Sequence, residues 1–301
     1  MSTDVSTLNQ EFGIAGQVTF RDDSDGFIVI DIDNKHCTAS VALQGAHLMT
    51  WQPKGGEPVI WMSPVATLAH GKSIRGGVPI CWPWFGAHVS DASFPGHGFA
   101  RTVPWDVIDT TALEDGSTRI SFRISDVKKD QWPHHAPAEI HMVIGAVLEM
   151  ELATINRDVE TLTVGDALHT YFCVGDVSKV VVRGLEGCDY LDKVGKATRR
   201  FQQGDVTISS EVDRIYFDQE QDVVIEDPVM QRDIRIEKRS SHSTIVWNPW
   251  ADKCKQMGDF GSDDGYLGML CVESANADED VVQLAPGETH RLWMRYSVEK
   301  A

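Results

Sequence analysis

Hydrophobic and polar residues alternate with a period of two along several stretches of this chain. The clearest stretches are 117–125, 148–153 and 291–298, with shorter ones at 233–237 and 244–247. Such alternation places one set of side chains on a core and the other toward solvent, so it predicts β-strands. No segment shows a convincing helical period.

Turn signals separate these stretches. Gly, Pro and Asp cluster at 54–56, 114–116, 264–265 and 285–287, at spacings that suit successive antiparallel strands. We find no repeat or linker that would divide the chain, although 301 residues exceed the usual domain size. The pattern predicts an all-β protein with a single domain over residues 1–301, of which 1–11 form a flexible N-terminal extension.

Composition and charge narrow the classes of function. Hydrophobic residues make up 42% and charged residues 24%, as in an ordinary globular protein. The formal net charge of −18 disfavours binding to nucleic acid or to anionic membranes, which need a basic surface. An anionic ligand would therefore depend on a few local arginines or lysines.

Neither end of the chain nor its interior carries a secretory signal or an apolar stretch long enough to span a bilayer. The six cysteines are scattered without a C-x-x-C pair, which argues against a zinc site and a disulfide framework. We therefore expect reduced thiols, no metal and a cytoplasmic location.

The first stretch with candidate chemistry is SIRGGVPICWPWFG at 73–86, within an aperiodic, aromatic-rich segment that reads as a long loop over a sheet. Its paired glycines allow close backbone approach, and Arg75 offers a donor fork suited to phosphate or carboxylate. A tight structural loop with a surface arginine fits the same residues.

The second is HGFAR at 97–101, where His97 and Arg101 lie four residues apart. In an extended segment both side chains share one face and can meet one ligand. An exposed surface loop is the structural alternative.

The third is DALHTYF at 166–172, which reads as a strand. Leu168, Thr170 and Phe172 would share the core face, leaving His169 and Tyr171 on the other. A histidine titrates near neutral pH and suits proton transfer, although an isolated histidine in a strand is more often a hydrogen-bonded structural residue.

The fourth is CVESAN at 271–276, where Glu273 interrupts an apolar strand. This carboxylate must reach solvent or face a polar pocket, because burying it unpaired is costly. Partial burial would raise its pKa toward the range of a general base.

Together with VDRIYF at 212–217 and VWNPW at 246–250, these motifs stand in an order that resembles the glucose-6-phosphate 1-epimerases of the aldose 1-epimerase superfamily. The resemblance covers roughly residues 12–299. It implies a large antiparallel β-sandwich of galactose mutarotase type.

The resemblance also implies roles for individual residues. His169 and Glu273 match the family's catalytic pair, and Arg75 and Arg101 match positions that hold the sugar phosphate. His97 resembles a substrate-positioning histidine, and Asp213 resembles a carboxylate that binds sugar hydroxyls. Gly96 stands where some relatives carry a substrate-contacting glutamine.

The implied reaction interconverts the α and β anomers of a hexose 6-phosphate, most simply glucose 6-phosphate. The ring opens to the aldehyde, the C1–C2 bond rotates and the ring recloses, without a cofactor. Glu273 would take the proton of the anomeric hydroxyl while His169 protonates the ring oxygen. The alternatives are a free-aldose mutarotase and a non-catalytic carbohydrate-binding protein; the sequence leaves the oligomeric state open, with a monomer favoured.

Overall fold

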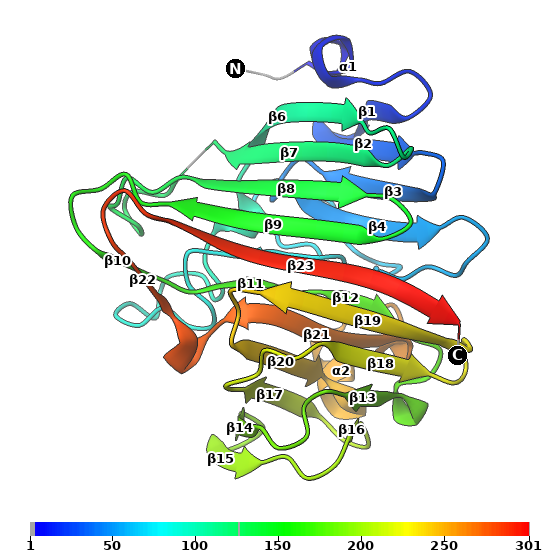
Figure 1. The fold of residues 1–301 in the computed structure, drawn as a ribbon, viewed down its shortest axis with the longest axis vertical. Helices are drawn as coiled ribbons and strands as arrows, with labels where there is room; N and C mark the ends of the chain where they lie inside the picture. Colours follow the sequence, from blue (N-terminus) through cyan, green and yellow to red (C-terminus); the bar gives the residue numbers. More distant parts are fainter. Residues whose placement is uncertain (1–3, 126, 301) are drawn as a thin grey trace.

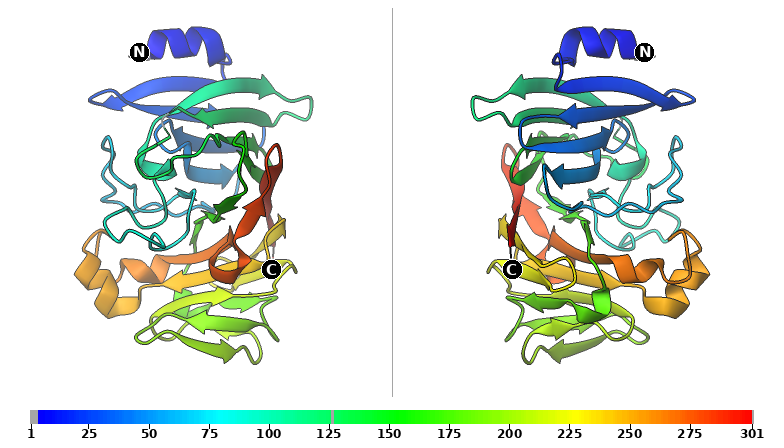
Figure 2. Two further views of the ribbon diagram at one scale, coloured as in Figure 1. Left: turned by 90° about the vertical axis from the view of Figure 1, so that its left-hand side faces the viewer. Right: turned by 90° about the vertical axis from the view of Figure 1, so that its right-hand side faces the viewer.

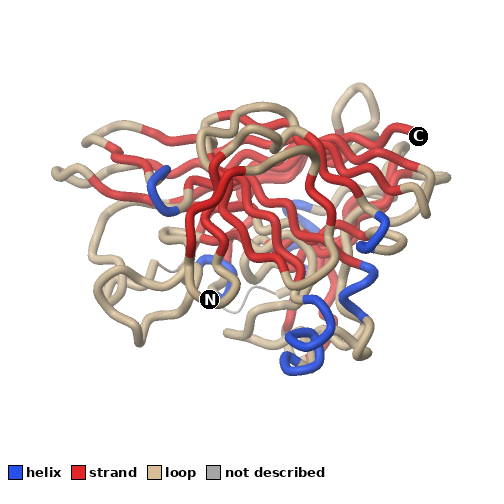
Figure 3. The backbone as a smooth tube through the Cα atoms, turned by 90° about the horizontal axis from the view of Figure 1, so that it is seen from below, coloured by secondary structure: helices blue, strands red, loops and turns tan. Residues whose placement is uncertain are grey.

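The computed structural model describes residues 4–125 and 127–300. Strands and loops make up most of this part of the chain, as Figure 3 shows, and every pairing between its named strands is antiparallel. The predicted all-β fold class is confirmed.

Over the described residues, the largest sheet has nine strands and spans the face shown in Figure 1. In spatial order its strands are β16 (Val206–Thr207), β13 (Val181–Arg183), β18 (Val223–Asp227), β19 (Arg232–Arg239), β23 (Thr289–Lys300), β9 (Leu148–Ile155), β8 (Ala138–Ile144), β7 (Thr118–Ile124) and β6 (Trp105–Ala112). All of the alternating stretches but 244–247 fall in it. Their buried and part-exposed residues alternate as predicted, except that Ser121 and Ala153 are also buried.

Two further sheets lie behind this one (Figures 1 and 2). A four-stranded sheet runs in sequence order through β1 (Val18–Ser24), β2 (Phe27–Asp33), β3 (Cys37–Ala42) and β4 (His47–Pro53). In the described chain an eight-stranded sheet runs through β15 (Thr198–Phe201), β14 (Asp189–Asp192), β17 (Val212–Tyr216), β20 (Ser243–Asn248), β21 (Met269–Asn276), β11 (Asp166–Leu168) and β5 (Ile80–Cys81), with β12 (Tyr171–Cys173) also paired to β21. A small pair joins β10 (Leu162–Val164) to β22 (Val282–Leu284).

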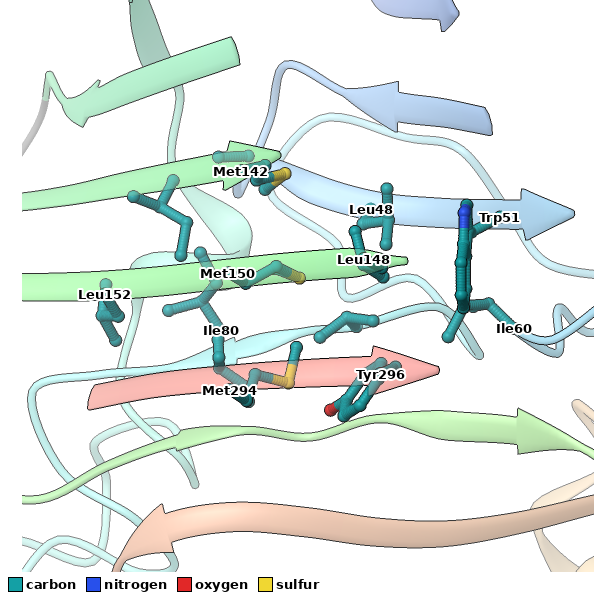
Figure 4. Close-up of a cluster of buried hydrophobic side chains, with 14 of the residues drawn as sticks. Leu48, Trp51, Ile60, Ile80, Met142, Leu148, Met150, Leu152, Met294 and Tyr296 are labelled. Carbon is teal, nitrogen blue, oxygen red and sulfur yellow. The ribbon is translucent and has the colours of Figure 1, made fainter. Parts of the chain in front are cut away.

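The core fills the space between the sheets. Figure 4 shows side chains of β4, β8, β9, β23 and β5 meeting there, among them Leu48, Met142, Leu148 and Met294, each with 0% exposure. The same apolar cluster extends from Leu8 to Tyr296. A single domain over residues 1–301 stays a prediction.

The structure contains helices that the pattern does not predict. Two are α-helices among the described residues, α1 (Val5–Phe12) and α2 (Trp250–Met257), and four are 3₁₀ turns: η1 (Ala100–Thr102), η2 (Val177–Lys179), η3 (Gly265–Gly268) and η4 (Asp278–Asp280). Each α-helix spans only eight residues, too short for its period to emerge from one sequence.

The expected flexible extension at 1–11 is wrong over residues 4–11, and residues 1–3 lie outside the described residues. Helix α1 docks on β1, because Leu8 is buried and the Asn9 side chain both donates to and accepts from the Phe20 backbone, at 2.7 and 2.9 Å. These contacts fix the segment.

Among the described residues, no helix has the length and apolar character needed to cross a bilayer. All six cysteines lie among the described residues and are unbridged there.

Candidate active site

Strand pairing around β21 brings His169 and Glu273 together. β11 pairs with one half of β21 and β12 with the other, and His169 lies in the gap between β11 and β12. The His169 amide donates to the Pro79 carbonyl at 3.0 Å, so the gap is filled by the 73–86 loop. Nδ1 of His169 lies 3.3 Å from Oε1 of Glu273.

The faces predicted for 166–172 are confirmed, although the strand is interrupted. Leu168 and Phe172 belong to the main core, and Thr170 Oγ1 lies 2.5 Å from the buried Tyr296 hydroxyl. His169 and Tyr171 point the other way and stack on each other, with ring centroids 5.0 Å apart. The core side therefore fixes which side chains face the pocket.

His169 and Glu273 are both largely buried. The side chain of Glu273 is 1% exposed and that of His169 is 12% exposed. Burial raises the pKa of Glu273 well above its ordinary value, and the charge of Asp213 adds to this shift. Burial lowers the pKa of His169 well below 6.5, and electrostatic interactions with His97 and Arg101 reinforce the change. Both shifts favour the uncharged forms, which are a protonated carboxyl on Glu273 and a neutral imidazole on His169.

His97 faces the pair from the 97–101 turn, and its ring centroid is 5.8 Å from that of His169. Burial lowers its pKa to about 3. Nδ1 accepts the Gly86 amide proton at 3.3 Å, so Nε2 carries the ring proton. His97 is thus a neutral donor suited to a sugar oxygen.

Arg75 is held in place before any ligand arrives. Its Nε donates to Oδ2 of Asp259 at 2.9 Å and its Nη1 donates to the Tyr171 hydroxyl at 2.7 Å. Asp259 follows the C-cap residue of helix α2, Gly258, which adopts the left-handed conformation. The 73–86 loop and α2 lie on the same side of the molecule in both views of Figure 2.

Two more cations line the pocket. Arg101 donates from Nη2 to the Gly96 carbonyl at 2.9 Å, and Lys193 Nζ lies 3.6 Å from Oδ1 of Asp213. The pocket therefore presents three cationic side chains, with Arg75 as the third, in a strongly acidic protein.

These groups surround one cavity of about 400 Å³, within the usual range for small-ligand sites. All six residues singled out in the sequence line it: Arg75, His97, Arg101, His169, Asp213 and Glu273. Sequence reasoning missed Lys193 and Asp259, which carry no motif signal, and assigned no role to Trp247, although its motif was noted. Trp247 forms an aromatic wall beside His169, with centroids 6.2 Å apart.

Fold, pocket and relatives together define an antiparallel β-sandwich isomerase of the mutarotase type. A model of the aldose 1-epimerase family matches residues 29–297. An Escherichia coli K12 protein provisionally named glucose-6-phosphate 1-epimerase is 38% identical over 258 residues, which cover 85% of each chain. A Cenchrus ciliaris protein with the same provisional name is 35% identical over 269 residues, covering 85% of this chain and 80% of its own. The chain belongs to the aldose 1-epimerase family.

A solved structure similar to this one supports the same family assignment. The crystal structure of a Salmonella typhimurium protein, provisionally named a mutarotase, matches with a TM-score of 0.87 and 33% identity, covering 95% of this chain and 94% of the other. A Clostridium acetobutylicum galactose mutarotase-like protein, at 14% identity and a TM-score of 0.72, shares the fold. The predicted sandwich of galactose mutarotase type is confirmed.

Proposed function

We propose that this protein interconverts the anomers of a hexose 6-phosphate, with glucose 6-phosphate as its substrate, and that His169 and Glu273 carry the proton transfers. The observation that carries the proposal is a buried imidazole and carboxylate 3.3 Å apart, in a cavity that also holds three cations. A proton-transfer pair suits the sugar ring, and the cations suit a phosphate.

In the proposed reaction Glu273 removes the proton of the anomeric hydroxyl while His169 protonates the ring oxygen, and the C1–O5 bond breaks. After rotation about C1–C2 the aldehyde recloses and both protons return. This cycle needs ionised Glu273 and protonated His169, whereas burial favours the uncharged form of each group, with the one proton of the pair on Glu273. Moving that proton from Glu273 to His169 sets up the reactive form, and hydrogen bonds from the sugar hydroxyls would stabilise its charges.

In this proposal the other residues that line the pocket position the substrate. Arg75 and Arg101 hold the phosphate, and Lys193 adds a third positive charge. His97 and Asp213 bind sugar hydroxyls. Phosphate binding remote from C1 is then used to orient the reacting centre. A phosphorylated substrate also fits a cytoplasmic location, because sugar phosphates are retained inside cells.

The test is the rate at which α-glucose 6-phosphate equilibrates with its β anomer, measured by NMR exchange. We expect clear acceleration by the wild-type protein and a loss of about 10²–10⁴-fold in kcat for Glu273→Gln, the usual contribution of one acid-base group. Glu151→Gln, a β9 surface carboxylate paired with Arg291, is the control and should retain full activity.

Two results would redirect the assignment. Acceleration with galactose but not with the phosphate would identify a free-aldose mutarotase. Sugar binding without acceleration of either would identify a binding protein.

A further inference from the structure

A thiol lies beside the proposed catalytic pair. Cys271 and Glu273 are two residues apart on β21, so their side chains share a face of the sheet. A ring nitrogen of His169, the Cys271 sulfur and a Glu273 carboxylate oxygen all lie within 4.8 Å of one another. Cys271 has 0% exposure. The proposed reaction uses only two of these three groups.

Polar atoms in this cluster lack partners. Within the described residues, His169 Nδ1 and Glu273 Oε2 are buried and make no hydrogen bond of acceptable geometry. Buried polar atoms of folded proteins nearly always have a partner, so unpartnered ones converging on one point indicate a ligand.

We propose that His169, Cys271 and Glu273 also form a binding site for Zn²⁺, which enters through the sugar pocket and excludes the substrate. Imidazole, thiolate and carboxylate are the three donor types that zinc takes, and the thiolate disfavours Mg²⁺ and Ca²⁺. The negative charges of the ionised thiol and carboxylate balance the 2+ charge, and the protons of the Cys271 thiol and the Glu273 carboxyl leave to solvent.

The geometry requires only a small adjustment. Tetrahedral zinc, with bonds of about 2.0–2.3 Å, holds its donors roughly 3.3–3.6 Å apart. Atoms now within 4.8 Å must therefore approach by at most roughly 1.5 Å, through rotation of the Glu273 and Cys271 side chains. Three protein donors leave the fourth position to water, as in zinc sites that face a pocket. Zinc bound there would hold both proposed proton-transfer groups, so it would act as a competitive inhibitor.

The test uses Co²⁺ as a spectroscopic substitute for Zn²⁺ and needs no enzyme activity. We expect the wild-type protein to develop a thiolate-to-cobalt charge-transfer band, and added Zn²⁺ to remove it. Cys271→Ser should lose the band, while Cys188→Ser, a half-buried cysteine absent from the pocket, should keep it. Glu273→Gln retains the thiol and should weaken affinity by at least the ~10–100-fold cost of an outer-shell change.

A missing band in the wild type, or one that persists in Cys271→Ser, would overturn the proposal. Circular dichroism shows whether Cys271→Ser folds; if it does not, Glu273→Gln decides by its cobalt affinity, and unchanged affinity also overturns the site.

A second experiment measures inhibition of the enzyme and rests on the proposed function. Zn²⁺ should raise the KM for glucose 6-phosphate in the wild type, and about tenfold more Zn²⁺ should be needed in Cys271→Ser. If cobalt binds as expected but no sugar is turned over, the proposed function fails and the metal site stands.

Discussion

At the scale of single residues, the two arginines of the pocket differ in how they are held. Arg75 is locked by Asp259 and by Tyr171, which stacks on His169. Replacing Arg75 therefore disturbs the ring beside the catalytic pair as well as the pocket charge. Arg101 makes one hydrogen bond to a backbone carbonyl of its own turn, which makes it the cleaner probe of phosphate binding.

Arg101→Ala should reduce kcat/KM for glucose 6-phosphate by about 10–150-fold, the equivalent of a hydrogen bond to a charged group at about 1.5–3 kcal/mol. The rate with free glucose, which lacks the phosphate, should change far less. NMR exchange rates on both sugars give the comparison. Arg119→Ala, on the exposed face of β7, is the control. Equal losses on the two sugars would refute the phosphate role.

At the scale of elements, the 73–86 loop depends on Gly77. Its amide donates to the Trp61 carbonyl at 2.8 Å, and its own carbonyl accepts the Tyr171 amide at 3.0 Å. Its φ is +71°, and a Cβ there would lie 2.2 Å from Nε2 of His47 and 2.5 Å from the Leu48 carbonyl. Only glycine allows the loop to approach β4 this closely.

Gly77→Ala should therefore cost about 1–3 kcal/mol more unfolding free energy than Gly71→Ala, because overpacking adds to the shared cost of positive φ. Gly71 has a similar φ of +73° but open space around its Cβ position. Urea unfolding of the two variants measures the difference. Similar midpoints would show that the loop can move away from β4.

The contact between β4 and this loop also makes stability depend on pH. His47 is fully buried, its Nε2 donates to the Gly76 carbonyl at 2.9 Å, and its Nδ1 has no partner among the described residues. Burial lowers the pKa of His47 to about 4, against 6.5 when unfolded. The unfolded chain binds more protons between these values, so stability is full above pH 6.5 and falls as the pH drops toward 4.

For His47 alone, the loss between pH 7 and pH 5 is about 2 kcal/mol of unfolding free energy. His47→Gln, which keeps an amide donor but does not titrate, should lose about that much less over the same interval. Urea unfolding at both pH values provides the measurement, and His88→Gln, at a half-buried histidine in the loop after β5, is the control. A fall as large in His47→Gln as in the wild type would contradict this assignment.

At the scale of the whole molecule, 45 acidic residues face 27 basic ones. Many are paired across neighbouring strands, as Arg235 of β19 is with Glu299 of β23, but exposed pairs contribute little each. The excess negative charge repels itself and destabilises the compact state.

The urea midpoint at pH 7.5 should therefore rise as NaCl increases from about 0.01 to 0.15 M, because the Debye length shortens from about 30 to 8 Å. KCl should act equally, since screening depends on ionic strength. A midpoint that falls over this range would show that attractive pairs outweigh the net repulsion.

The sequence alone determined the local features of this protein. Period-two alternation identified the long strands because each has one buried face, and the motif order pointed to the pocket residues through the family resemblance. The hydrophobic pattern did not predict the short helices. Helix α2 has only eight residues, and α1 buries only Leu8, so neither produces a recognisable helical period. These elements exist because tertiary contacts hold them.

Tertiary structure decided how the site is assembled and charged. Pairing of β11 and β12 with β21 sets His169 against Glu273, 104 positions away, and no local pattern encodes that register. The same packing brings Lys193 and Asp259 to the pocket from segments without a motif. It also removes the pair from water and so shifts both pKa values, because desolvation depends on every layer packed around a group and not on its neighbours in the chain.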